Sequence, residues 1–164
     1  MTGKVKPIPD GYHTATPYLI VREAAKAIEF YKKAFGATET MRMGDGNKIH
    51  HAEIKIGTSP IMLGDECIEM QALSPATIGN SPVTIMLYVE DVDAVFNKAV
   101  SAGATVQRPL ADQFYGDRTG GLIDPFGHKW YVATHIEDVS HEELQKRSAA
   151  MQKEQKEKAG AAAK

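Results

Sequence analysis

The segment Tyr18–Ile28 reads YLIVREAAKAI, and the segment Met86–Phe96 repeats its pattern as MLYVEDVDAVF. Each is a short apolar run, followed by charged residues and then by apolar residues at helical spacing. The first helical pattern ends at Gly36 and the second at Gly103, and glycine commonly terminates a helix. Strand, helix start and helix stop therefore recur in the same order, at an offset of 68 residues that becomes 67 at the glycine. This order predicts an internal repeat.

Each copy continues with three strand-like runs separated by turn residues. Each copy therefore predicts a βαβββ module, over residues 12–75 and 82–138. One such module would not bury both its sheet face and its helix well. Two modules predict an α+β domain over residues 12–138, with curved mixed sheets, helices outside and a pocket in each concave sheet. The six runs are Thr38–Gly44, Lys48–Gly57, Pro60–Asp65, Thr105–Asp112, Phe114–Asp124 and His128–Ile136.

Composition excludes several classes of protein. The chain has 164 residues, 43% of them apolar, with 19 basic and 21 acidic residues and a net charge of −2. This near-balance gives no electrostatic reason to expect a nucleic acid or an anionic membrane as a partner. No apolar run approaches membrane-spanning length, and the first residues lack the apolar core of a signal peptide. With Cys67 as the single cysteine there is no internal disulfide framework, and we expect a cytoplasmic protein.

The last segment, residues 139–164, differs from the rest in being rich in Ala, Glu, Lys and Gln. Ser140 and Glu143 fit a capping box, which predicts that a helix begins there. Few apolar side chains follow Leu144. We therefore expect a helical tail that is partly disordered towards its end.

The run Ala27–Ala37, AIEFYKKAFGA, occurs with LYVEDVD at Leu87–Asp93 and DPFGH at Asp124–His128. Together these motifs resemble the glyoxalase/bleomycin-resistance superfamily, also called vicinal oxygen chelate proteins, and most of all its phosphonate-operon-like branch. The resemblance covers residues 12–138. It implies paired βαβββ modules, a concave site in each composite sheet and a homodimer. It also implies, for the metal-using members, one divalent ion held by His, Glu or Gln from the first and last strands of the modules.

The repeat assigns the four metal-ligand positions of that family to this chain. The first-strand positions fall on Thr16 and Thr84, which are 68 residues apart like the repeat itself. The last-strand positions fall on Met62 and Tyr131, although a one-residue slip at Met62 stays open. Thr, Met and Tyr are poor ligands for Zn, Ni, Fe or Mn. We therefore expect no metal cofactor, and these four residues to line a ligand-binding site instead.

The run KIHHAEIKIG at Lys48–Gly57 contains the candidate catalytic pair. Alternation along a strand puts His51 and Glu53 on one face and His50 on the other. Glu53 can orient His51 through one ring nitrogen and leave the other to move a proton. Two alternatives stay open: polar residues lining a cavity or interface, and a non-standard metal site completed by His13 or His135.

Two further candidates lie in the second copy. Arg118 could bind an anionic or carbonyl oxygen of a ligand through two hydrogen bonds, or form a salt bridge with Asp117 or Asp112. Trp130 and Tyr131 are both candidate ligand contacts. Because they lie on opposite faces of the strand, one of them should face the ligand, and the metal-equivalent position favours Tyr131.

These residues predict a protein that binds a small, partly apolar or aromatic molecule without the usual metal, as the bleomycin-resistance proteins sequester a drug. The alternative is an enzyme of the same superfamily, with lyase, isomerase or dioxygenase-like activity. Such an enzyme would work without metal through His51 and Glu53, or with a non-standard metal site. A structural dimer with no small ligand is a third class, for which a set of His, Glu and Arg residues is unnecessary.

Overall fold

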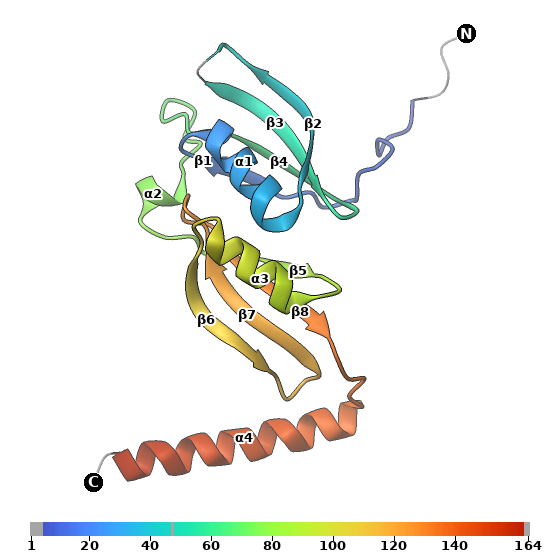
Figure 1. The fold of residues 1–164 in the computed structure, drawn as a ribbon, viewed down its shortest axis with the longest axis vertical. Helices are drawn as coiled ribbons and strands as arrows, with labels where there is room; N and C mark the ends of the chain where they lie inside the picture. The colour runs from blue at the N-terminus through green and yellow to red at the C-terminus, as the bar shows by residue number, and fades with distance from the viewer. Residues whose placement is uncertain (1–4, 47, 163–164) are drawn as a thin grey trace.

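The computed structural model describes residues 5–46 and 48–162 of the chain. It has the predicted α+β architecture of two βαβββ modules, joined by a short helix and followed by a long one (Figure 1). The strand order is β1-β4-β3-β2 in the first sheet and β5-β8-β7-β6 in the second. In both modules the first strand is parallel to the last and the other neighbours are antiparallel.

The elements follow the predicted runs closely. The first module contains β1 (Tyr18–Val21), α1 (Ala24–Phe35), β2 (Thr38–Gly44), β3 (Ile49–Ile56) and β4 (Ser59–Asp65). The connection contains α2 (Pro75–Ile78). The second module contains β5 (Thr84–Tyr88), α3 (Val92–Ser101), β6 (Thr105–Asp112), β7 (Asp117–Ile123) and β8 (Lys129–His135), and α4 (His141–Ala162) follows it.

Helices α1 and α3 pack against each other and bring the two modules together (Figure 1). The buried side chains of α1 recur at helical spacing and include Ala27, Ile28, Tyr31 and Ala34. The helix ends at Gly36, which has a φ of 67°, and the backbone N–H of Gly36 donates to the carbonyl of Lys32. Glycine adopts this left-handed conformation without steric cost, so its place in the motif is explained by the helix stop.

Gly120 of β7 sets how closely α3 approaches its sheet. A Cβ atom at this position would lie 2.5 Å from Cε2 of Phe96, a distance that real Cβ contacts do not show. Phe96 is buried on α3, so its ring packs directly onto the backbone of the strand.

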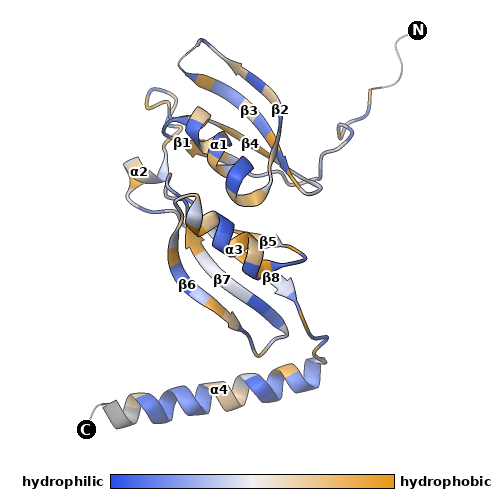
Figure 2. Ribbon diagram, in the orientation of Figure 1, coloured by the Kyte–Doolittle hydropathy of each residue, from blue (hydrophilic) through white to orange (hydrophobic). Residues whose placement is uncertain are grey.

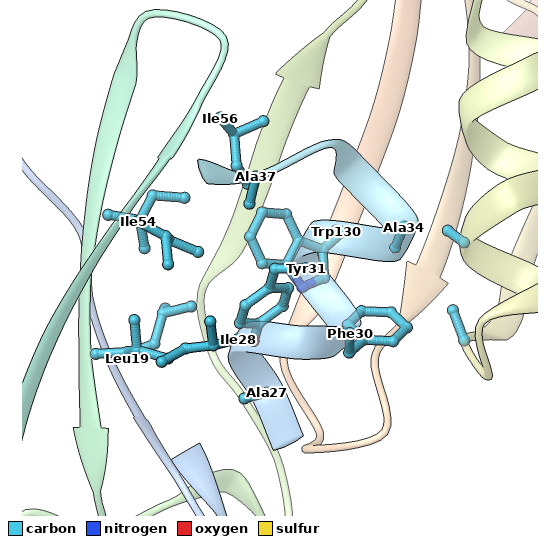
Figure 3. Close-up of a cluster of buried hydrophobic side chains, with 14 of the residues drawn as sticks. Leu19, Ala27, Ile28, Phe30, Tyr31, Ala34, Ala37, Ile54, Ile56 and Trp130 are labelled. Atoms are coloured by element: carbon cyan, nitrogen blue, oxygen red, sulfur yellow. The ribbon is translucent and has the colours of Figure 1, made fainter. Parts of the chain in front are cut away.

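Two of the three motifs that carry the family resemblance, Ala27–Ala37 and Asp124–His128, meet in the core. Tyr31 of α1 donates its hydroxyl to Oδ2 of Asp124 over 2.8 Å, and Nε1 of Trp130 donates to the same oxygen over 2.9 Å. The other carboxyl oxygen accepts the backbone N–H groups of Phe126 and His128, each over 2.9 Å. Burial, followed by the charge of Asp124, raises the pKa of Tyr31 well above its usual range. The rings of Tyr31 and Trp130, which share this acceptor, lie side by side in the core with centroids 5.4 Å apart (Figure 3). The network therefore joins the first module to the second through buried polar contacts.

Helix α4 lies beside the end of the second module (Figure 1) and is hydrophilic along most of its length (Figure 2). Its start is the predicted one, because the backbone N–H of Glu143 donates to Oγ of Ser140 over 3.2 Å. Arg147 binds Glu137 through two hydrogen bonds of 2.7 and 2.8 Å and anchors the helix to the second module. Residues 163–164 lie outside the described residues, and the expected disorder at the tail stays a prediction. In the described ranges, no helix combines the length and apolarity that crossing a membrane requires.

Candidate functional site

One face of each sheet packs against a helix, and the other face is open. In the first sheet, strand register places Tyr18, Met62, Glu53 and Met41 in one row across β1, β4, β3 and β2. The residues that alternate with them, such as Leu63, are buried on the helix side. The exposed fractions of Tyr18 (47%) and Met41 (39%) show that this open face is accessible.

His51 and Glu53 lie on this open face and interact, as the alternation predicted. Nε2 of His51 lies 3.1 Å from Oε1 of Glu53, and Nδ1 of His51 lies 2.9 Å from the hydroxyl of Tyr18. The hydroxyl of Tyr12 donates to Oε2 of Glu53. His50 lies outside this chain and contacts Asp45 near the hairpin end. The result is a continuous hydrogen-bonded chain, Tyr18–His51–Glu53–Tyr12, which is called the relay chain below.

The electrostatics of the relay chain favour an ionised Glu53. The hydrogen bond from Tyr12 is the largest influence and lowers the pKa of Glu53, with a further lowering from His51, while burial acts in the opposite direction. The same hydrogen bond raises the pKa of Tyr12. Burial first, and the charge of Glu53 second, raise the pKa of Tyr18. Both phenols are therefore neutral hydrogen-bond donors at neutral pH.

Tyr12 and Tyr18 were missed as site residues in the sequence analysis. Tyr12 precedes the first strand and is 41 residues from Glu53. Tyr18 opens β1, and the register Tyr18–Met62–Glu53 that links it to the candidate pair becomes visible once the strands are paired. The signal that could have found Tyr18 was its place two residues after Thr16, on the same face of the same segment.

A cavity of about 680 Å³ lies where β1, β5 and α2 meet. The sequence predicted a pocket within each concave sheet, whereas this cavity lies between the first strands of the two modules. Thr16 and Thr84 line it, but Met62 and Tyr131 do not. The lining is mostly apolar, with a few polar side chains, and consists of Ala15, Thr16, Pro17, Tyr18, Leu19, Ile20, Leu73, Pro75, Ile78, Asn80, Ser81, Pro82, Val83, Thr84, Ile85, Met86, His128 and Lys129.

The residues at the family's metal-ligand positions do not fit a divalent ion. Two are threonines at the cavity, and Met62 and Tyr131 belong to separate sheets. Among the residues that the structure describes, no three His, Cys, Asp or Glu side chains converge as a metal site requires. His135, one of the residues considered for a non-standard site, instead pairs with Asp117 and Asp138 at 2.7 and 3.1 Å. A thioether, a phenol and two hydroxyls are the wrong donor set for Zn, Ni, Fe or Mn.

Tyr131 lies on the open face of the second sheet. Its cross-strand partner on β7 is Gly121. A Cβ atom at Gly121 would come within 2.9 Å of the Tyr131 ring. The guanidinium carbon of Arg108 lies 5.9 Å from the ring centroid, within cation–π range. The ring also lines a second cavity, of about 450 Å³, to which Met151 of α4 contributes. Tyr131 therefore remains a ligand-contact candidate, at a place separate from the cavity between the modules.

Trp130 is a correction to the predicted site. Its exposed fraction is 0%, and its ring packs against Tyr31 and Phe35 in the core. The prediction that Trp130 contacts a ligand is wrong. The physical reason is that its side of β8 faces the helices, where the indole N–H binds Asp124.

Arg118 forms the salt bridge that the sequence left open. Its guanidinium binds both carboxyl oxygens of Asp93 on α3, at 2.7 and 2.8 Å, and Asp112 at 2.9 Å. The bonds to Asp93, followed by that to Asp112, raise the pKa of Arg118. Asp117, the other predicted partner, instead accepts one hydrogen bond from the Tyr88 hydroxyl and contacts His135. In this structure Arg118 ties β7 to α3 and β6.

The family follows from this fold and these motifs. Residues 12–132 match the model described as the Glyoxalase/Bleomycin resistance protein/Dioxygenase superfamily, and the chain belongs to it. An uncharacterized protein of Mycobacterium tuberculosis is 44% identical over 134 residues, which cover 79% of this chain and 79% of that protein.

Solved structures support the same fold. The X-ray structure of the gene product At5g48480 from Arabidopsis thaliana has a TM-score of 0.61 and 30% identity, covering 74% of this chain and 98% of that one. The crystal structure of TioX from Micromonospora sp. ML1 has a TM-score of 0.60 and 24% identity, covering 78% of this chain and 100% of that one. The second likeness concerns the fold alone.

Proposed function

We propose that this protein binds a small, partly apolar or aromatic molecule, without the metal ion that many members of its superfamily use. The observation that carries the proposal is the cavity of about 680 Å³ between β1 and β5. Its size lies in the range of small-molecule sites, which are mostly apolar with a few placed polar groups. Thr16, Thr84, Asn80 and Lys129 would supply those polar groups.

The metal-free character of the site rests on the chemistry of its side chains. The two threonines occupy positions where metal-using relatives carry His, Glu or Gln. A hydroxyl group can hydrogen-bond a ligand but holds a divalent ion weakly compared with imidazole or carboxylate. Binding is therefore expected to be the same with an added divalent metal and with a chelator.

Cavity filling tests this proposal, with the fluorescent aromatic probe 1-anilinonaphthalene-8-sulfonate as the ligand. We expect saturable binding near one probe per chain. Thr84→Phe places a ring at the start of β5, and it should weaken binding at least about tenfold because the ring occupies the cavity. Thr58→Phe, in the exposed turn between β3 and β4, is the matched control and should bind like the wild type. Equal weakening or no weakening in the two variants would contradict this location.

An enzymatic role is the second candidate, and the relay chain is the observation that favours it. A carboxylate, an imidazole and a phenol joined in series form an arrangement suited to proton transfer. Sequestration alone does not require this order. The two functions differ in outcome, because a sequestering protein releases its ligand unchanged and an enzyme releases a product.

We also propose that the protein is a homodimer in which a second copy covers the open sheet faces. Large apolar side chains are exposed on both faces, including Tyr18 and Met43 on the first sheet and Met86 and Tyr88 on the second. Large apolar side chains exposed on one face of a sheet are typical of an interface between proteins.

Light scattering coupled to size exclusion measures this assembly. We expect the mass of two chains for the wild type and a shift towards one chain for Met43→Glu, because a charge would be buried at the interface. Met70→Glu is the matched control, since Met70 is exposed in the loop before α2 and should leave the dimer intact. A single-chain mass for the wild type would contradict the proposal.

The placement in the phosphonate-operon-like branch rests on the motifs at Ala27–Ala37, Leu87–Asp93 and Asp124–His128 together, and it stays a prediction. The cytoplasmic location expected from the sequence likewise stays a prediction.

A further inference from the structure

We propose that Tyr18 is the residue that exchanges a proton with the bound molecule, with His51 and Glu53 as positioning residues behind it, and that the ligand carries a weakly acidic O–H group, as a phenol or an enol does. The inference rests on the proposed function, because the same cavity has to hold the ligand.

Tyr18 contributes both to the cavity and to the relay chain. It lines the cavity between β1 and β5, and its hydroxyl lies 2.9 Å from Nδ1 of His51. The other ring nitrogen of His51 is engaged by Glu53 at 3.1 Å. Both nitrogens of His51 have partners, and Tyr18 is the member of the relay chain that also lines the cavity, so the path we propose for a proton from the cavity to His51 runs through Tyr18.

The relay chain has a defined direction. An ionised Glu53 can only accept hydrogen bonds, so Nε2 of His51 carries the proton that it donates to Oε1. Nδ1 then presents a lone pair and accepts the hydroxyl of Tyr18. Tyr12 donates to the second oxygen of Glu53 and fixes the orientation of that carboxylate. The partners of the two ring nitrogens therefore determine the tautomer of His51.

The proton transfer balances without any other reactant. The ligand O–H donates to the oxygen of Tyr18, and its proton moves there while the phenolic proton of Tyr18 moves to Nδ1 of His51. The products are a ligand oxyanion, a neutral Tyr18 and an imidazolium beside the Glu53 carboxylate. One O–H bond of the ligand breaks, one is re-formed on Tyr18, and one N–H bond forms on His51. The raised pKa of Tyr18 fits a residue that passes a proton on and does not remain a phenolate.

The cavity also suits the product of this transfer. Lys129 lines the same cavity and supplies a positive charge for the oxyanion. Leu73, Ile78 and Val83 supply apolar contacts for the body of the ligand. An apolar molecule with one acidic O–H group therefore fits the cavity in both protonation states.

The experiment uses the full chain and 4-nitrophenol, whose visible absorption distinguishes the phenol from the phenolate. At a pH below the probe's own pKa, the wild type should bind it as the phenolate. Tyr18→Phe should still bind the probe, weakened by no more than about tenfold for one lost hydrogen bond. The ionised fraction of the bound probe should fall at least about tenfold in this variant. Tyr88→Phe is the matched control, because its hydroxyl donates to Asp117 in the second module and lines neither cavity, and it should behave like the wild type.

His51→Gln and Glu53→Gln separate proton transfer from packing. Both should keep binding and lose ionisation of the probe, because the proton acceptor or its carboxylate partner is removed. If the wild type binds the probe as the neutral phenol, the proposed proton transfer is contradicted, while the binding proposal is not affected. A wild type that binds neither 4-nitrophenol nor 1-anilinonaphthalene-8-sulfonate overturns the binding proposal, and the relay with it.

A measurement without ligand tests the relay independently. The ring ¹⁵N shifts of His51 should show the tautomer protonated at Nε2 in the wild type and a change at Nδ1 in Tyr18→Phe. A tautomer protonated at Nδ1 would contradict the proposal whatever the probe does.

Discussion

Replacing Asp124 with alanine is expected to lower the free energy of unfolding by about 3–5 kcal/mol. The substitution removes the acceptor of two buried side-chain donors, Tyr31 and Trp130, and of two backbone N–H groups in the turn. The exposed fraction of Asp124 is 4% and those of the two aromatic residues are 0%, so water does not readily replace the lost partner. A buried donor without an acceptor retains most of its desolvation cost.

Urea denaturation monitored by circular dichroism measures this loss. Asp124→Asn is the matched control, because the amide keeps one acceptor oxygen for the turn and nearly the same volume. It should cost less than the alanine variant, although its NH₂ group would face the indole N–H of Trp130. Tyr31→Phe removes a single hydrogen bond and should cost about 1–2 kcal/mol. A loss below about 1 kcal/mol for Asp124→Ala would mean that the network contributes little to stability.

Replacing Trp130 with alanine is expected to cost about 3–5 kcal/mol as well, chiefly through the cavity that it leaves. The indole is fully buried between Tyr31 and Phe35, with ring centroids 5.4 and 4.8 Å away. The neighbouring residue provides the matched control. Tyr131 points to the open face of the same strand, so Tyr131→Ala should cost about 1 kcal/mol or less.

The comparison of these two variants tests which face of β8 packs against the helices. Urea unfolding midpoints should separate them clearly, with Trp130→Ala the less stable protein. Equal losses, or a larger loss for Tyr131→Ala, would contradict the assignment of Trp130 to the core. Because Trp130 and Asp124 are in contact, the double variant should lose less than the sum of the two single losses.

The fold could be predicted from the sequence because its determinants are local. The strand, helix and glycine pattern of each copy lies within about twenty residues, and the structure pairs the same parts of the two copies. Tyr18 aligns with Met62 in the first sheet as Met86 aligns with Tyr131 in the second. The repeat therefore carried enough information to assign equivalent positions, including Met62 despite the slip that had stayed open.

The site was less predictable because it depends on contacts across the chain. The pairing of His51 with Glu53 follows from alternation within one strand, and it was predicted. The contacts of that pair with Tyr12 and Tyr18 span 41 and 33 residues, and they require the strand register. The position of the cavity depends on how α1 packs on α3, which no local pattern encodes.

The sequence left open which face of β8 packs against the helices, for a related reason. Alternation separates Trp130 from Tyr131 but does not say which of them faces the helices. The carboxyl group of Asp124, six residues before Trp130, decides this by binding the indole. In the same way, Arg118 had two sequence neighbours of opposite charge, yet its principal partner is Asp93 on a helix 25 residues away.

The buried carboxyl network has a consequence for the duplication itself. The residue of α3 that corresponds to Tyr31 is Ala99, and the short Gly57–Ser59 turn of the first module has no counterpart of Asp124. The two modules thus share one topology but differ at this contact. The first supplies the donor, Tyr31, and the second supplies the acceptor, Asp124. Neither half can replace the other, and a chain built from two copies of either one would lose the polar contact that holds them together.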